Sequence, residues 1–329
     1  MEQGFWEQLK KPFFVLAPMA DVTDPAFRRI IAKYGKPDVT WTEFISADGL
    51  FLADYEGREK IKRDMEYSEA ERPVVVQFFT AHPDMMRKAA KYAAELGFDG
   101  FDINMGCPDR SIEKQGCGAA LMKNPKLAQE LIQAAKDGIK ESGKKIPVSV
   151  KTRIGYNKNT LEEWLPMLLK AEPAVITVHA RTRKEMSKVP ADWAQVKHAV
   201  EIRNDLKSET LILGNGDVTD LDDAQKKVDE TGCDGVMLGR AIFGNPWLFG
   251  NLLDKNKKEV SIEERLNVMV EHTKLYEELL GDVKSFNIMK KHYKAYVSGW
   301  DGAKELRIKL MDAKDASEVE GVVLKYLKT

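Results

Sequence analysis

The sequence has little cysteine, no long hydrophobic run and no surplus of either charge, and each absence excludes a class of protein. Cys107, Cys117 and Cys233 are an odd number at spacings that fit neither a disulfide framework nor a zinc site. No apolar run approaches the length that spans a bilayer, and residues 1–10 lack the features of a signal peptide. We therefore expect reduced thiols, no metal and no membrane partner in a cytoplasmic protein.

The overall charge gives no indication of a polyanionic partner, because 51 basic residues nearly balance 52 acidic ones. The local charge differs. Residues 284–309 carry seven basic side chains and only two acidic ones, which suggests one cationic face on an otherwise acidic body. A solvated, lysine-rich helix surface would explain the same count.

Short β-rich apolar runs alternate with helical stretches, a pattern typical of parallel βαβ units. Eight such units in about 240 residues predict a (β/α)₈ TIM barrel. An open doubly wound sheet is the alternative, but the turn after the first run is Pro18-Met19-Ala20-Asp21 and lacks the glycine fingerprint of that fold. The expected strands are residues 13–18, 39–44, 74–79, 100–105, 148–153, 175–181, 211–216 and 235–240.

The strand signals end after Arg240, and the rest of the chain has helical periodicity. Ser261 and Glu264 resemble a capping box at the start of a helix over 262–280. Further helices are expected over 283–297 and within 303–328. We place a domain boundary near Asp254, with the charged residues 254–259 as a linker. This gives an α/β barrel over 1–254 and a small all-helical domain over 255–329.

Polar residues end several of the expected strands, where an apolar core would not need them. The active site of a TIM barrel is built at the carboxyl ends of its strands, so these side chains are predicted to share one mouth. Each alone is more often a satisfied core group. The residues are Gln77, Asn104, Lys151, Arg153, His179 and Arg181.

The seventh and eighth units carry glycine-rich turns, Gly214-Asn215-Gly216-Asp217 and Gly239-Arg240-Ala241. Barrels often bind a phosphate between these two loops, because glycines let backbone amides approach the anion. Arg240 would add a bidentate contact. Simple tight turns are an equally good interpretation of the glycines alone. Together with Lys151, the loops suggest a phosphorylated cofactor whose reduced ring a lysine would stabilise.

Cys107 lies between Gly106 and Pro108, just beyond the fourth strand. An ordinary thiol is mostly protonated at neutral pH and can act as an acid. A nucleophilic role would need a lowered pKa and a partner base, and no histidine is adjacent in sequence. Composition alone favours an inert buried thiol.

Four segments in order resemble the motifs of the tRNA-dihydrouridine synthases. They are Leu16 to Asp24, Asn104-Met105-Gly106-Cys107-Pro108, Val150 to Gly155, and His179-Ala180-Arg181-Thr182-Arg183. The resemblance covers the barrel and continues into the helical tail. It implies an FMN-dependent enzyme that reduces the C5=C6 bond of uridines in tRNA and uses NADPH or NADH as reductant.

The resemblance also implies roles for individual residues. Cys107 would be the general acid that protonates C5, while reduced FMN delivers hydride from N5 to C6. The cofactor would be bound by Ala17, Pro18, Met19, Gln77, Lys151, His179, Asn215, Gly216, Asp217, Gly239 and Arg240.

Substrate contacts are expected in two places. At the mouth, Asn104, Arg153 and Arg181 would contact the uracil or its flanking phosphates. In the tail, residues 289–294 and 305–307 resemble the family's RNA-binding motifs, and their basic residues are Lys290, Lys291, Lys294 and Arg307. Tyr293, Tyr296 and Trp300 would stack on bases, or else form the core of a helical bundle.

Two segments depart from the family pattern. Residues 184–190, Lys-Glu-Met-Ser-Lys-Val-Pro, replace a segment that usually carries an aromatic residue and a glycine before Ala-Asp-Trp. Cys117 has no catalytic role that we can assign and is expected to be a small packing residue. Because the 184–190 loop has a changed sequence, the family resemblance does not indicate what this loop contacts.

Two other functions compete with this interpretation. A flavin barrel acting on a free pyrimidine, of the dihydroorotate or dihydropyrimidine dehydrogenase type, would use the same mouth but has no need of a basic helical tail. A non-catalytic RNA-binding protein would keep the tail but has no need of Cys107, Lys151 and the phosphate loops.

Overall fold

The computed structural model describes residues 3–252 and 260–328. Within them, eight parallel strands follow the order β1-β8-β7-β6-β5-β4-β3-β2. A parallel bridge between Val15 and Val39, with a hydrogen bond from the Leu16 amide to the Val39 carbonyl, joins the two ends of this order. The predicted TIM barrel is confirmed. Its strands are β1 (Phe13–Leu16), β2 (Thr40–Ser46), β3 (Val74–Phe79), β4 (Gly100–Met105), β5 (Val148–Arg153), β6 (Val175–His179), β7 (Leu211–Asn215) and β8 (Gly235–Leu238).

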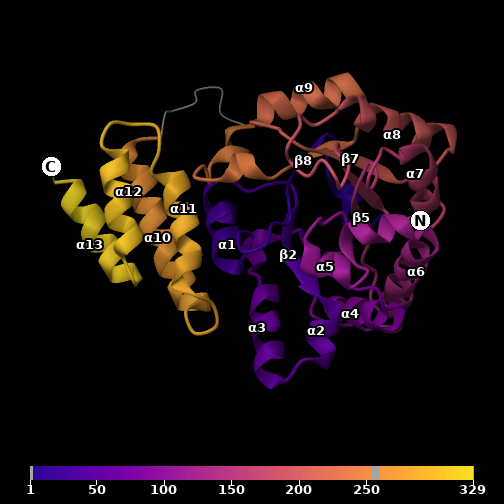
Figure 1. The fold of residues 1–329 in the computed structure, drawn as a ribbon, viewed down its shortest axis with the longest axis horizontal. Coiled ribbons are helices and arrows are strands. Elements are labelled where there is room, and N and C mark those ends of the chain that lie inside the picture. Colours follow the sequence, from indigo (N-terminus) through magenta and orange to yellow (C-terminus); the bar gives the residue numbers. More distant parts are fainter. Residues whose placement is uncertain (1–2, 253–259, 329) are drawn as a thin grey trace.

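Helices surround these strands and alternate with them along the chain (Figure 1). Several begin where the sequence offers a capping side chain. Asp24 accepts a hydrogen bond from the amide of Phe27, and Asp220 accepts one from that of Asp223. The barrel helices are α1 (Pro25–Tyr34), α2 (Ala47–Leu52), α3 (Tyr55–Met65), α4 (Pro83–Glu95), α5 (Arg110–Lys114), α6 (Pro125–Glu141), α7 (Leu161–Leu169), α8 (Ala194–Asp205) and α9 (Leu221–Thr231).

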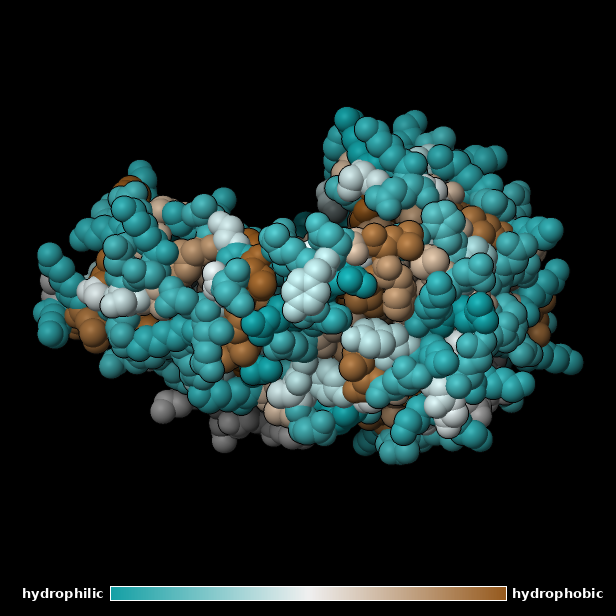
Figure 2. Space-filling view, turned by 90° about the horizontal axis from the view of Figure 1, so that it is seen from below, coloured by the Kyte–Doolittle hydropathy of each residue, from teal (hydrophilic) through white to brown (hydrophobic). Residues whose placement is uncertain are grey.

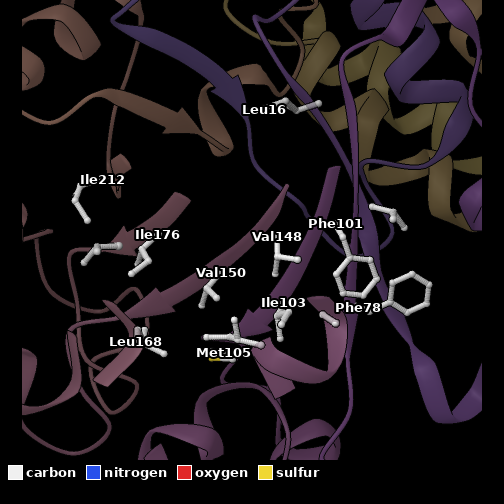
Figure 3. Close-up of a cluster of buried hydrophobic side chains, with 14 of the residues drawn as sticks. Leu16, Phe78, Phe101, Ile103, Met105, Val148, Val150, Leu168, Ile176 and Ile212 are labelled. Atoms are coloured by element: carbon white, nitrogen blue, oxygen red, sulfur yellow. The ribbon is translucent and has the colours of Figure 1, made fainter. Parts of the chain in front are cut away.

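Successive strand residues face opposite sides of the sheet, so that one side packs against the surrounding helices and the other lines the barrel interior. The side that faces the helices is apolar. Figure 3 shows part of this cluster, in which strand residues such as Ile103, Val150 and Ile176 lie with Leu168 of α7. The barrel interior holds a second apolar cluster that includes Trp6, Trp41, Val75 and Leu213. Trp6 belongs to the 3₁₀ turn Gly4–Gln8, so the amino-terminal segment contributes to this interior cluster.

The carboxyl half of the barrel has a polar interior. Beyond the interior apolar cluster, the inward positions of β2 to β7 carry polar side chains, and this change from apolar to polar marks the open end of the barrel. They are Glu43, Gln77, Asp102, Asn104, Lys151, His179 and Asn215.

The carboxyl-terminal part forms a helical bundle of α10 (Ile262–Leu280), α11 (Met289–Tyr296), α12 (Ala303–Asp312) and α13 (Ala316–Tyr326). The first predicted helix is confirmed, and the Ser261 side chain accepts a hydrogen bond from the Glu264 amide at its start. The second is shorter than predicted, because residues 286–288 form a 3₁₀ turn. The predicted third helix is wrong as a single element, since Asp315 starts a new helix by accepting from the Glu318 amide.

The bundle packs beside α1 (Figure 1). Ala26 and Ile30 of α1 share one apolar cluster with Leu266, Tyr276 and Tyr293 of the bundle. The outline of the molecule is indented where bundle and barrel meet (Figure 2). The proposed domain boundary at Asp254 and the linker 254–259 lie outside the described residues. No helix in the described part of the chain combines the length and apolar character needed to cross a membrane.

Candidate active site

A chain of hydrogen bonds links the interior of the barrel to the loop that carries Cys107. Gln77 donates from Nε2 to Oδ2 of Asp102, and its own Oε1 accepts from Nδ2 of Asn104 at 3.0 Å. Oδ1 of Asn104 in turn accepts from the backbone amides of Gly106 and Cys107, at 3.2 and 2.9 Å. Asp102 is fully buried, and burial raises the pKa of its carboxyl to about 6.

Cys107 is half-buried at the end of this chain. Its carbonyl accepts from the Ala119 amide at 2.9 Å, and Gly118 lies so close that a Cβ there would stand 2.7 Å from that carbonyl. Burial raises the pKa of the Cys107 thiol, and the charge of Asp109 acts in the same direction with a smaller effect. The thiol is therefore protonated at neutral pH, which suits an acid and not a nucleophile.

Lys151 lies in the barrel interior beside Asn215. Its Nζ donates to Oδ1 of Asn215 at 3.1 Å, and Nδ2 of Asn215 donates to the Met237 carbonyl at 2.7 Å. Burial, helped by the charge of Arg153, lowers the pKa of Lys151 to about 8. An amine with this pKa keeps its charge at neutral pH in a desolvated position, where it stabilises negative charge strongly.

The loops after β7 and β8 meet at Asp217. Its Oδ1 accepts from Arg240 at 2.5 Å, while its Oδ2 accepts from Arg181 and from the Ala191 amide. Partial burial raises the pKa of Asp217, but the Ala191 amide and the two arginines outweigh this and hold it below its usual value. The Arg240 side chain remains 66% exposed. The carboxylate of Asp217 thus acts as an anchor for the Arg240 side chain.

The same loop passes close to Ala191 and His179 only because residue 216 is glycine. Gly216 has φ +130°, and a Cβ there would lie 2.8 Å from that of Ala191 and 3.3 Å from the His179 ring. At the end of β8, Gly239 faces the side chains of Ala17 and Met19, since a Cβ built on it would lie within 3.6 Å of both. The three predicted cofactor loops therefore share one end of the barrel.

His179 is neutral in this setting. Burial holds its pKa well below the ordinary value, and the charges of Arg153, Lys151 and Arg181 act in the same direction. Arg181 approaches Nε2 of His179 at 3.2 Å. Because a guanidinium only donates, this nitrogen is the acceptor and the ring proton is assigned to Nδ1.

Arg153 and Arg181 are almost fully buried, and most of their donors are bonded to the protein itself. Arg153 donates to the carbonyls of Gly106, Thr182 and Met186, and Arg181 donates to that of Val189 at 2.7 Å. The two arginines therefore hold the unusual 184–190 loop from inside. Their contact with a substrate stays a prediction, as does that of Asn104.

The tail residues divide into exposed and internal groups. Lys294 is exposed, Lys290 is partly exposed, and Nζ of Lys291 lies 4.0 Å from Asp21 in the loop after β1. Arg307 donates to the Val297 carbonyl at the end of α11. The stacking alternative is wrong for Tyr293 and Tyr296, which are buried in the core of the bundle.

Sequence reasoning missed Asp102, Glu43 and Lys284. Glu43 of β2 is buried and forms an ion pair at 2.8 Å with Lys284, a mostly buried residue in the turn between α10 and α11. Asp102 could have been found, because it precedes Asn104 by two positions and so faces the same side of the sheet. The partner of Glu43 lies 241 residues away, and no local pattern indicates it. Cys117 is buried, as expected for a packing residue.

Comparison with known proteins places this geometry in a family. The model of the dihydrouridine synthase (Dus) family matches residues 15–329. The probable tRNA-dihydrouridine synthase 2 of Bacillus subtilis (strain 168) is 39% identical over 325 residues, which cover 98% of this chain and 96% of that protein. A probable tRNA-dihydrouridine synthase of Staphylococcus aureus (strain MRSA252) is 36% identical, with coverage of 98% and 95%.

Solved structures share the fold at much lower identity. Histamine dehydrogenase from Rhizobium sp. 4-9 superposes with a TM-score of 0.55 at 13% identity, over 80% of this chain and 48% of that one. The old yellow enzyme from Trypanosoma cruzi gives 0.51 at 11%, over 77% and 91%. These likenesses concern the barrel architecture. The family match and the two relatives, which cover nearly the whole chain, show that the protein is an enzyme of the dihydrouridine synthase family.

Proposed function

We propose that this protein reduces the C5=C6 double bond of specific uridines in tRNA to dihydrouridine, with bound FMN as cofactor and NADPH or NADH as reductant. The observation that carries the proposal is the shared mouth. A protonated thiol, a buried lysine and two glycine loops with an exposed arginine lie at one end of the barrel, in a chain of this family.

The residues at the mouth fit an FMN molecule. Its phosphate would be held by the backbone at Gly216, Asp217 and Gly239 and by the guanidinium of Arg240, which Asp217 orients. Its ring would lie against Ala17, Pro18 and Met19, near Gln77, Lys151, Asn215 and His179. When bound and reduced, FMN supplies a hydride to C6 of the uracil.

Lys151 and His179 set the charge around such a ring. The ammonium group of Lys151 is held by Asn215 in a buried position and would stabilise the negative charge of a reduced ring. His179 stays neutral because burial and the surrounding cations hold its pKa low. It can therefore accept or donate a hydrogen bond without adding charge.

Cys107 supplies the proton. Its raised pKa keeps the Sγ atom protonated at neutral pH, so that the proton is available for C5 of the uracil. The hydrogen bond from the Cys107 amide to Asn104 fixes the loop that carries the thiol. After the proton leaves, the thiolate regains one from water, which the half-exposed position allows. This assignment needs no nucleophile and no partner base.

The RNA is held by two surfaces. A uridine must leave its stack to enter the barrel, which costs a few kcal/mol. Lys290, Lys291 and Lys294 lie on α11 of the bundle, with Lys291 4.0 Å from Asp21 in the loop after β1, and would compensate through phosphate contacts. Direct contacts of Asn104, Arg153 and Arg181 with the uracil belong to the same proposal.

The test combines a spectrum with one variant. Purified protein should show flavin absorbance that bleaches with NADPH without air and returns faster with tRNA than with free uridine or orotate. Cys107→Ala should keep this absorbance and its bleaching but lower tRNA turnover by roughly 10²–10⁴-fold, the usual contribution of a general acid. Cys117→Ala, the matched control, should retain turnover.

Three results would count against the proposal. A colourless protein that cannot be reconstituted with FMN removes the cofactor. Faster reoxidation by free pyrimidine than by tRNA favours the pyrimidine reductase. Normal turnover of Cys107→Ala removes the general-acid role.

A further inference from the structure

A largely buried ion cluster lies between the barrel and the helical bundle. Glu43 is 5% exposed, and one of its carboxyl oxygens is bonded to the barrel while the other is bonded to the helical bundle. Oε1 accepts from the backbone amide of Asp21, in the loop after β1, and Oε2 accepts from Nζ of Lys284 at 2.8 Å. Lys284 also pairs with Asp64 of α3 at 2.7 Å.

The loop that Glu43 holds is the one that faces the proposed cofactor site. Asp21 has φ +51°, a left-handed conformation that aspartate adopts more readily than most residues other than glycine, and here its amide is held by Glu43. Two residues earlier, the Met19 amide donates to Oγ1 of Thr23 at 3.0 Å and so closes the turn around Asp21. Met19 and Ala17 also face Gly239 at the end of β8. Glu43 therefore fixes the segment 17–23 against the opposite wall of the mouth.

Lys284 determines whether Glu43 can do this. Burial raises the pKa of Glu43 to about 7, and Lys284 is the largest influence that lowers it. Burial alone would lower the pKa of Lys284, but Glu43 and Asp64 outweigh it and raise that pKa. Without the lysine, Oε2 of Glu43 would lose its hydrogen-bond donor and face the like charges of Asp24 and Asp64, so the carboxyl group would no longer be held in place. The ionisable groups that surround Glu43 are Asp21, Asp24, Asp64, Tyr276, Lys284 and Lys291.

We propose that the Glu43–Lys284 pair is a positioning link through which the helical bundle sets the conformation of the 17–23 loop. Lys284 touches neither substrate nor cofactor and acts through Glu43. The helical bundle then has a second function besides holding RNA, because packing of the bundle against the barrel fixes the 17–23 loop, which forms one wall of the mouth. The consequence for catalysis rests on the proposed function, whereas the link itself does not.

The first measurement is hydrogen exchange of the segment 17–23 in flavin-free protein. Lys284→Met should speed exchange of the Asp21 amide by roughly tenfold, because Oε2 of Glu43 then has no donor and the carboxyl group is free to turn away from that amide. Lys284→Arg should stay near the wild type. Lys274→Met is the matched control, because Lys274 pairs with Glu320 inside the bundle, and it should change nothing in this segment.

The second measurement uses the flavin-loaded enzyme. Lys284→Met should weaken FMN binding and lower kcat with tRNA by roughly tenfold, with a smaller change in KM. Glu43→Gln should act alike, and the double variant should be no worse than the worse single variant, because both changes break one link. Glu43→Gln also serves if Lys284→Met does not fold.

The outcomes separate the link from the proposed function. Unchanged exchange at Asp21 in Lys284→Met and Glu43→Gln, or additive effects in the double variant, would overturn the link. So would a lowered Tm without faster exchange, which indicates a purely structural role. A wild type that neither binds FMN nor reduces tRNA argues against the proposed function, while the exchange result still decides the link.

Discussion

At the scale of single residues, the orientation of the Gln77 amide depends on one buried carboxylate. An ionised Asp102 only accepts hydrogen bonds, so Gln77 must give it Nε2 and turn Oε1 toward Asn104. Asn104 must then point Oδ1 at the amides of Gly106 and Cys107. Ser149 completes the arrangement by donating to Oδ1 of Asp102 at 2.5 Å. The side chains of Asp102, Ser149, Gln77 and Asn104 thus fix one another's orientation and, through Asn104, the position of the Cys107 loop.

Replacing Asp102 tests this chain. Asp102→Leu should lower the free energy of unfolding by about 1–3 kcal/mol, because Nε2 of Gln77 loses its buried acceptor. It should also lower tRNA turnover, since the Cys107 loop is then less firmly held. Asp102→Asn should retain most of both, because its oxygen can still face Gln77 while the Ser149 hydroxyl turns to accept. Urea unfolding and single-turnover rates measure the two effects. Wild-type behaviour of Asp102→Leu would contradict the chain.

These residues also show what a sequence can predict about a site. Lys151 was predicted because a polar side chain at the end of an apolar strand has few structural reasons to be there, Asn215 because it lies in a glycine-rich turn, and Cys107 from the family resemblance. Asp102 was missed because it lies within an apolar run, where one charged residue is easily taken as a strand irregularity. Glu43 and Lys284 pair across 241 residues, so only the folded chain brings them together.

At the scale of elements, strands were easier to predict than tail helices. Parallel strands buried on both sides form distinct apolar runs, and β3, β4 and β5 have the predicted bounds. The break between α12 and α13 was missed although Asp315 and Glu318 have the spacing of a capping box. In α11, burial of Tyr293 and Tyr296 leaves lysine as the group that the helix offers to solvent.

The lysines of α11 carry a prediction of their own. Changing Lys290, Lys291 and Lys294 together to Ala should weaken tRNA binding and reduce the slope of log K against log salt by about one for each phosphate that is no longer neutralised. The flavin spectrum should not change. A matched control removes the same charge from Lys126, Lys140 and Lys144, which are exposed on or after α6. Equal weakening of tRNA binding in both triple variants would show that the position of the lysines is irrelevant.

At the scale of the whole molecule, the bundle docks on α1 through charged edges and an apolar centre. At the edge, Glu271 of α10 accepts from Lys33 at 2.6 Å and from Tyr34 at 2.5 Å. In the centre, the His272 and His292 rings lie 4.9 Å apart, next to Phe27 of α1. Within the described residues, no hydrogen-bond partner reaches any of their four nitrogens.

This histidine pair should make the docked structure sensitive to acid. Burial lowers the pKa of His272 to about 3, and burial together with His272 holds that of His292 well below its ordinary value. Below about pH 6.5 the unfolded chain binds protons at both rings and the folded chain does not. Stability is therefore lost as pH falls, by up to about 1.4 kcal/mol per pH unit for each histidine.

Other ionisable groups change the pH dependence of stability in the opposite direction, so the contribution of His272 and His292 must be isolated with a variant. Glu43, Asp24 and Asp102 have raised pKa values, and their contribution to stability grows as pH falls toward their unfolded values. Replacing both His272 and His292 by Leu should flatten the decline of Tm between pH 7 and pH 5. His198→Leu should not, because Glu201 and Glu162 raise the pKa of that ring above its ordinary value. If the double variant declines as steeply as the wild type, the acid sensitivity lies elsewhere in the molecule.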